Sequence, residues 1–147
     1  MRTLFILLFT FSLSFGQNRS FSKKEVLHIL KKNDKKKWTS CDSDSLYYKS
    51  EIIYLDDAQD FKCWKYVTWK FKSLKKFWLV NGKKNHGLTS TTILTEKNFY
   101  RLRIINKKNE ITLKIYNKKK LVETFLVIDA AYNDNLKCNR ITLKRIK

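Results

Sequence analysis

Five side chains are of the types that most often bind metals or transfer protons: Cys41, Cys63, Cys138, His28 and His86. No two cysteines have the Cys-x-x-Cys spacing typical of zinc sites, and both histidines are far from the cysteines in sequence. His28 falls in a helical segment and His86 in a loop, and the pattern supplies neither with an acid–base partner. No Ser/His/Asp pattern or pair of carboxylates takes their place. We therefore predict no catalytic residue, no metal site and no cofactor.

Two polar segments resemble ligand-binding loops without meeting their requirements. Asp42 and Asp44 alternate as in a calcium loop, but no glycine stands at the sixth position and no glutamate at the twelfth. Gly82, Lys83 and Lys84 lack the spacing of a phosphate-binding P-loop. Both segments are interpreted as ordinary loops.

The amino-terminal residues 1–17 have the layout of a secretory signal peptide. A short basic start, Met1-Arg2-Thr3, precedes an apolar stretch over residues 4–15, and small residues follow near Gly16. The apolar stretch is about 12 residues long, well below the roughly 20 needed to span a bilayer. The alternative is a buried amino-terminal helix. We expect cleavage near Gly16 or Gln17 and a secreted or periplasmic protein, and no later stretch is apolar enough for a transmembrane helix.

Residues 18–147 are long enough for one domain with one hydrophobic core. The chain has 4 Trp, 10 Phe and 7 Tyr and no proline. Disordered chains are poor in aromatic residues, so this composition indicates a folded domain.

The formal net charge of +19 comes mainly from lysine, because 26 of the 32 basic residues are Lys and 6 are Arg. Proteins that read phosphates and bases favour arginine for its bidentate geometry. We interpret most of the charge as a solvated, lysine-rich surface. The alternative is attraction to an anionic surface such as lipid head groups or acidic glycans. Export makes nucleic acid an unexpected partner.

The periodicity predicts a mostly β domain with one short helix. Ser22 and Glu25 form a capping-box pattern that begins a helix over residues 23–32. Polar loops are expected at residues 41–45 and 81–87. About eight short strands joined by tight turns favour an antiparallel up-and-down barrel, which hides the sheet edges. Strands are expected at or near residues 35–40, 46–55, 62–72, 77–80, 89–95, 99–105, 111–116, 121–128 and 141–146.

Alternation along these strands predicts the side chains that face the barrel interior. In several strands, apolar residues at every second position alternate with polar or charged ones. Eight strands enclose either a filled core or room for one small ligand. The predicted interior and ligand-binding residues are Trp69, Phe71, Leu102, Ile104, Leu113 and Phe125.

The order of these motifs resembles the small secreted lipocalin-like domains of bacteria. A short helix precedes a Lys-Lys-Trp ending at Trp38, Cys63 stands shortly before a Trp-Lys-Phe ending at Phe71, and a hairpin leads to residues 77–79. The segments 109–113, 123–128 and 141–145 are similar to that family's last three strands. The resemblance implies an up-and-down barrel with an internal pocket that binds a ligand without catalysis.

Two functions follow as expectations. The first is an exported, non-catalytic barrel that binds a small apolar or amphipathic ligand. The second is an envelope-associated interaction or structural module whose lysine-rich surface docks on an acidic partner, lipid or glycan.

Export also favours a disulfide, because three cysteines allow one bond and one free thiol. In a closed up-and-down barrel the first and last strands are antiparallel neighbours. Cys41 follows the first strand and Cys138 precedes the last, so this topology predicts Cys41–Cys138 with Cys63 free. Cys41–Cys63 is the alternative if residues 42–62 form one irregular loop.

Overall fold

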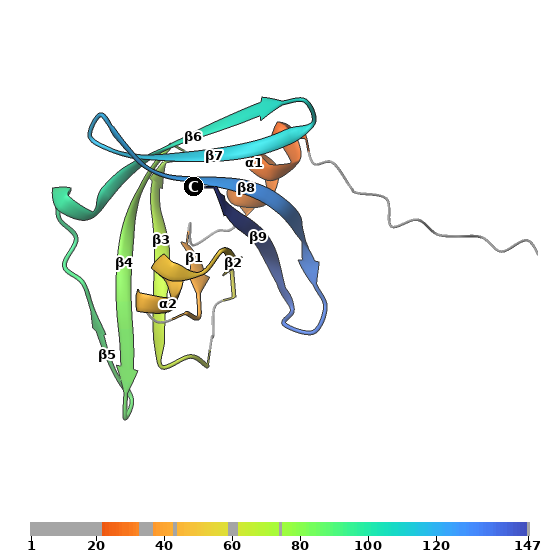
Figure 1. The fold of residues 1–147 in the computed structure, drawn as a ribbon. Helices are drawn as coiled ribbons and strands as arrows, with labels where there is room; N and C mark the ends of the chain where they lie inside the picture. The colour runs from red at the N-terminus through yellow and green to blue at the C-terminus, as the bar shows by residue number, and fades with distance from the viewer. Residues whose placement is uncertain (1–21, 33–36, 43, 59–61, 74, 147) are drawn as a thin grey trace, which may run out of the picture.

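A computed structural model describes residues 22–32, 37–42, 44–58, 62–73 and 75–146. The segment 1–17 lies outside these residues, so the signal peptide stays a prediction. Within these ranges nine strands form one antiparallel sheet, and eight of them close into a barrel (Figure 1), which confirms the predicted fold class. The elements are α1 (Lys23–Lys32), β1 (Lys37–Ser40), α2 (Asp44–Lys49), β2 (Ile52–Asp56), β3 (Lys65–Ser73), β4 (Lys76–Asn85), β5 (Leu88–Thr91), the 3₁₀ turn η1 (Glu96–Asn98), β6 (Phe99–Lys107), β7 (Glu110–Asn117), β8 (Lys120–Asn133) and β9 (Cys138–Ile146).

The first two strands exchange places relative to a simple up-and-down meander. β1 lies between β2 and β3, and β2 pairs with β9, so the barrel closes through β2 rather than β1. From β3 onward the barrel strands are neighbours in chain order. The short strand β5 is not part of the closed barrel and pairs only with the end of β4, over residues 82–85. Since every pairing is antiparallel, β1 and β9 run parallel to each other on either side of β2.

This order explains why the predicted disulfide is wrong. The bond joins Cys41 to Cys63, with Cα atoms 5.4 Å apart, and Cys138 is a buried free thiol. Cys41 directly follows β1 and Cys138 begins β9. Thr39 and Arg140 both pair with Asp56 of the intervening β2, so in these parallel strands Cys41 lies beyond that level and Cys138 before it, two strands apart. Cys63 precedes β3, the antiparallel neighbour of β1, and therefore lies beside Cys41. The alternative pairing is correct, although residues 42–62 contain α2 and β2 rather than one irregular loop.

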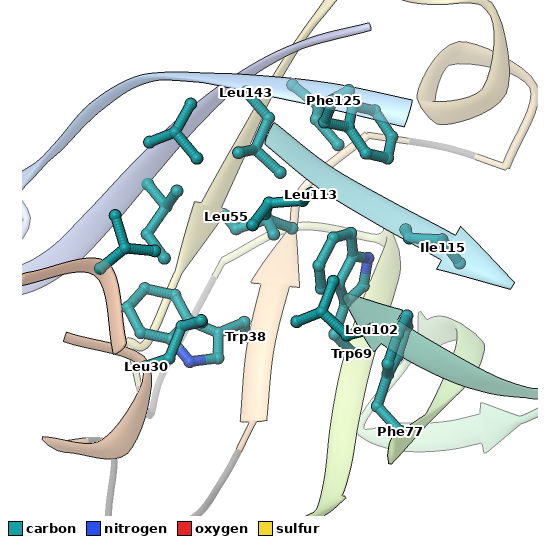
Figure 2. Close-up of a cluster of buried hydrophobic side chains, with 14 of the residues drawn as sticks. Leu30, Trp38, Leu55, Trp69, Phe77, Leu102, Leu113, Ile115, Phe125 and Leu143 are labelled. Carbon is teal, nitrogen blue, oxygen red and sulfur yellow. The ribbon is translucent and has the colours of Figure 1, made fainter. Parts of the chain in front are cut away.

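Helix α1 occupies residues 23–32 as the sequence predicts. The backbone N–H of Glu25 donates to Ser22 Oγ at 3.2 Å, and Ser22 N–H donates to Glu25 Oε2 at 2.6 Å. This reciprocal pair satisfies amide groups that a helix start leaves without intrahelical partners. Val26 and Leu30, four residues apart, bury the same face against the barrel core (Figure 2 shows Leu30 beside Trp38).

Helix α2 replaces the beginning of a predicted strand. Residues 46–55 were expected to be extended and 41–45 to be a loop, but residues 44–49 are helical and the strand begins only at Ile52. Tyrosine is frequent in strands because its side chain packs well against neighbouring strands. In this segment a contact with the barrel core favours a helix instead. The helix buries Tyr47 in the barrel, while Leu46 and Tyr48 remain exposed.

The predicted loop at residues 81–87 is also mostly strand. β4 continues to Asn85, and a two-residue turn leads into β5. His86 and Gly87 both have positive φ, 44° and 82°, as in the hairpin turns that match strand twist. The resulting β4–β5 hairpin extends beyond the rest of the barrel (Figure 1).

Strands β6 to β9 follow the predicted alternation closely. Leu102, Leu113, Phe125 and Leu143 lie buried in the core from four successive strands (Figure 2). Lys108 and Asn109, both with positive φ, form the two-residue turn between β6 and β7.

Candidate functional site

The six predicted interior residues lie in or against the core. Trp69, Leu102, Leu113 and Phe125 are buried, and Phe71 and Ile104 are partly buried against the same cluster. Their interior position agrees with the alternation, but a role in ligand binding is a separate matter. None of the six lines the hollow on the outer face of β1, β3 and β4, the hollow beside η1 or the hollow along the β4–β5 hairpin.

Aromatic and aliphatic side chains pack around Trp69 in the barrel interior (Figure 2). The Trp69 ring stacks on Phe77 with 4.8 Å between centroids and lies 6.1 Å from the Phe125 ring. Trp69 Nε1–H donates to the Tyr47 hydroxyl at 2.8 Å, so the buried indole N–H is paired. Burial raises the pKa of Tyr47 well above its ordinary value, with Glu123 adding to the rise, so this hydroxyl stays neutral.

Arg145 on β9 hydrogen-bonds to the backbone of α2 and of the residue that follows it, and so holds α2 against the barrel. Its guanidinium donates to the backbone carbonyls of Tyr47 and Ser50, at 2.7 and 3.2 Å, and pairs with the carboxylate of Glu123. Both charged side chains are 16 % exposed. Burial raises the pKa of Glu123, and Arg145 opposes the rise. We interpret this cluster as structural, because its donors and acceptors are directed at one another.

The candidate site is a groove on the outer face of β1, β3 and β4. Its volume is about 530 Å³, within the range of small-molecule pockets. The lining positions alternate with the interior residues Trp38, Val67, Trp69 and Leu79, so they point away from the core. The groove, hereafter the outer groove, is lined by Lys37, Thr39, Asp57, Ala58, Tyr66, Thr68, Lys70, Val80, Lys84, Thr91, Thr92, Ile93 and Leu94.

The floor of the outer groove is unusually buried for the outside of a barrel. Thr39, Tyr66, Thr68 and Val80 are all buried although their strands present them away from the core. Thr39 and Thr68 are cross-strand partners, and their hydroxyl oxygens are hydrogen-bonded at 2.9 Å. The floor therefore has polar atoms that are sheltered from bulk water.

Gly82 shapes this floor. It faces Tyr66 across the β3–β4 pair, and a Cβ at Gly82 would overlap the tyrosine ring. The absence of a side chain lets Tyr66 lie across β4. Burial raises the pKa of Tyr66, so its hydroxyl remains a neutral hydrogen-bonding group. Gly82 falls in the segment 81–87 that the sequence predicts to be a loop, so this role in β4 was not predicted.

Residues 92–95 form one wall of the outer groove, hereafter the strap. Thr92 N–H donates to the carbonyl of Asn81 at 2.9 Å, which fixes the strap to β4. Asn98 Nδ2 donates to the Ile93 carbonyl at 3.0 Å, and Thr95 N–H donates to Asn98 Oδ1 at 2.8 Å. The strap is thus held at both ends, while the Ile93 side chain is 80 % exposed beside the groove.

The charge of the outer groove is predominantly positive. Lys37, Lys70 and Lys84 line it from three different strands, against one carboxylate, Asp57. Both oxygens of Asp57 accept 2.7 Å hydrogen bonds from the backbone and side-chain N–H groups of Asn139, which direct this carboxylate toward β9. A negatively charged ligand group fits this arrangement better than a positive one.

The sequence contained a partial indication of the groove. Tyr66, Thr68 and Lys70 occupy the polar face of β3, which the alternation separates from Val67 and Trp69. The strap could not be anticipated, because it covers this face only through the fold-back of β5 and the contacts of Thr92 and Asn98.

The other candidate groups form no reactive cluster in the described part of the chain. His28 is exposed on α1, and His86 is exposed in the β4–β5 turn with its ring 6.5 Å from that of Trp64. Burial raises the pKa of the Cys138 thiol, with Asp56 and Asp57 adding to the rise, which disfavours the reactive thiolate. No group of three or more His, Cys, Asp or Glu suited to a metal ion occurs among the described residues.

Comparisons with known proteins identify no relative of this chain. No family model, no curated protein and no solved structure matches this chain. Within the described ranges, no helix has the length and apolar character needed to cross a membrane.

Proposed function

We propose that this chain is an exported, non-catalytic barrel of the lipocalin-like type that binds a small amphipathic anion in the outer groove. The observation that carries the proposal is the combination of three lysines, a hydroxyl-bearing floor and an apolar strap around one hollow of about 530 Å³. The lipocalin-like assignment rests on the motif order in the sequence and on the closed eight-stranded barrel.

The polar part of the ligand is assigned to the lysine side of the groove. Lys37 and Lys70 are cross-strand partners on β1 and β3, so their charges lie on neighbouring strands of the same face. Thr39 and Thr68 share one hydrogen bond, which leaves one of the two hydroxyls with a hydrogen to donate to a ligand beside these charges. A carboxylate, sulfonate or phosphate group is the chemistry that such donors favour.

The apolar part of the ligand is assigned to the strap side. Ile93 and Leu94 project from residues 92–95, and Val80 lies on the floor opposite. Ile93 is 80 % exposed, so covering it with an apolar ligand group would remove aliphatic surface from water. Because the strap is hydrogen-bonded at both ends, little ordering is needed on binding.

The outer groove supports a ligand site better than the barrel interior does. The stack of Trp69 on Phe77 and the hydrogen bond from Trp69 to Tyr47 occupy the centre of the interior. An interior ligand would have to displace packed side chains at a cost in stability. The outer groove requires no such displacement.

Titration with the amphipathic anion 1-anilinonaphthalene-8-sulfonate tests the proposal, together with native mass spectrometry of the mature protein for a co-purified molecule. The probe should bind at one site, and its affinity should fall as the salt concentration rises. Lys70→Glu reverses one charge in the groove and should weaken binding about tenfold. Lys114→Glu, on the outer face of β7, is the matched control and should leave the affinity unchanged.

An Ile93→Ser variant tests the apolar half of the site in the same titration. The variant should lower the affinity for the probe without changing the thermal stability of the protein, because the Ile93 side chain is exposed. Equal affinity of wild type, Lys70→Glu and Ile93→Ser would refute the outer groove as the ligand site.

A further inference from the structure

The end of the β4–β5 hairpin and the adjoining start of β3 form a projecting surface with exposed apolar side chains. We call residues 62–65 and 83–89 the hairpin tip. Within it Trp64 is 65 % exposed and Leu88 is 78 % exposed. The hairpin extends furthest from the barrel body (Figure 1). A tryptophan and a leucine at the far end of a molecule remain in water unless another phase or partner covers them.

The hairpin tip is held in shape by the fold. Lys84 N–H donates to the Trp64 carbonyl at 2.7 Å, which joins the two segments. The preceding residue, Cys63, is bonded to Cys41, and the Trp64 ring lies edge-on to His86. Trp64 is therefore presented from a constrained backbone, and its exposure does not arise from a long flexible loop.

Positive charge surrounds these apolar side chains. The tip contains Lys62, Lys65, Lys83 and Lys84, and its two segments contain no Asp or Glu. Lys65 and Lys83 are directly paired across β3 and β4, which places two like charges side by side. Such a pair is unfavourable in isolation and is relieved by a nearby negative surface.

We propose that the hairpin tip docks on the surface of an anionic lipid bilayer. Trp64 would lie at the level of the head groups, where tryptophan is favoured, and Leu88 would reach the boundary with the acyl chains. Lys62, Lys65 and Lys83 would face anionic head groups, which attract basic segments near a membrane surface. The hairpin tip shares only Lys84 with the residues that line the outer groove. The docking proposal is carried by Trp64, Leu88, Lys62, Lys65 and Lys83, none of which lines the groove, so it does not depend on the ligand proposed there.

The composition of the tip favours a bilayer over nucleic acid or a glycan. The tip has lysines without arginine, and arginine is the residue favoured for planar, bidentate phosphate recognition. Trp64 could stack on a base or a sugar, but Leu88 gains from neither. A bilayer interface accommodates both apolar side chains together with the surrounding charges.

Co-sedimentation with vesicles tests the proposal. The mature protein should bind vesicles of equimolar phosphatidylcholine and phosphatidylglycerol, bind phosphatidylcholine alone weakly, and be released as salt rises. Leu88→Ser and Lys83→Glu should each reduce binding to the mixed vesicles about tenfold. Leu136→Ser is the matched control for Leu88→Ser, because Leu136 is an exposed leucine in the β8–β9 turn, outside both the tip and the outer groove, and the variant should bind like wild type.

The position of Trp64 at the bilayer is tested with brominated lipids, which quench tryptophan at the interface. Quenching should disappear in Trp64→Phe while vesicle binding persists, since Trp38 and Trp69 are buried and the half-buried Trp78 lies near the start of β4, away from the tip at its end. Binding unchanged in Leu88→Ser and Lys83→Glu, or quenching that persists in Trp64→Phe, would overturn the proposal. Loss of heparin binding in these variants with vesicle binding intact would also overturn it and would identify the tip as a glycan site.

Discussion

Gly82 and Tyr66 are cross-strand partners whose contact sets the floor of the outer groove. The tyrosine ring occupies the space in which any side chain at position 82 would lie. A glycine inside a strand costs stability through its conformational freedom, and here it is matched by the burial of Tyr66. The pair links a backbone feature of β4 to the shape of the proposed ligand site.

Gly82→Ala is therefore expected to displace the Tyr66 ring and to lower stability by about 1–3 kcal/mol, the usual range for overpacking. The same change should weaken binding of the anionic probe. In a Tyr66→Ala background the added methyl group meets no ring, so the cost should vanish. A double-mutant cycle by urea denaturation measures this coupling, and independent, additive effects would contradict the relationship.

The Cys41–Cys63 bond closes a loop across α2 and β2, with a sequence separation of 22. Replacing both cysteines by serine should lower stability by about 3 kcal/mol if the bond acts by restricting the unfolded chain. Peptide mapping without reduction should recover Cys41 linked to Cys63. Cys138 should be alkylated only after denaturation, because it is buried; a Cys138 cross-link would contradict the strand order.

Tyr47→Phe should lower stability by about 1–3 kcal/mol, because it leaves the buried Trp69 Nε1–H without its acceptor. The ring is conserved in size, so packing is unchanged. Tyr48→Phe is the matched control, since Tyr48 is exposed on the same helix, and its effect should be small. Thermal unfolding of the two variants measures the difference, and equal effects would argue against α2 closing the barrel through Tyr47.

Glu123 predicts a specific pH dependence of stability. Because burial raises its pKa in the folded state, the folded protein holds this proton more tightly than the unfolded chain. The unfolding free energy therefore falls as pH rises from the ordinary Glu pKa of about 4.3 to the raised folded value. In Glu123→Gln this contribution is absent, so the stability of wild type relative to the variant should decline through that window.

Urea denaturation of both proteins at a series of pH values measures this difference. Glu51→Gln removes an exposed carboxylate paired with Lys144 at 3.0 Å and serves as the control for lost charge. A wild-type advantage that grows with rising pH would show that pairing with Arg145 outweighs burial of the carboxylate.

Local sequence pattern was sufficient for α1 and for β6 to β9. The capping pair Ser22 and Glu25 defines the start of α1, and alternation assigned Leu102 and Leu113 to the interior. These features depend on residues within one helix turn or one strand, so they are readable without the rest of the chain.

Features that depend on distant contacts were not predictable in the same way. The exchange of β1 and β2 depends on which strands pair with each other. The residues of β1 do not reveal that the strand pairs with β3 rather than with β9. The helix that contains Tyr47 is favoured by burial of the tyrosine in the barrel, where its hydroxyl accepts a hydrogen bond from Trp69. Gly82 lies in a strand because its lack of a side chain leaves space for the Tyr66 ring. The outer groove was missed for the same reason, since its strap is fixed by Asn81 and Asn98.

Leu113→Ala distinguishes a structural interior from a ligand-binding one. Leu113 is fully buried between β6 and β8, so truncation should lower stability by about 2–5 kcal/mol and leave a cavity. If ligand binding resides in the outer groove, the variant should bind the anionic probe with wild-type affinity at a temperature where it remains folded. Urea denaturation and the probe titration are the two measurements. A loss of probe affinity comparable to that of Lys70→Glu, in a folded variant, would return the binding site to the interior set of Trp69, Leu113 and Phe125.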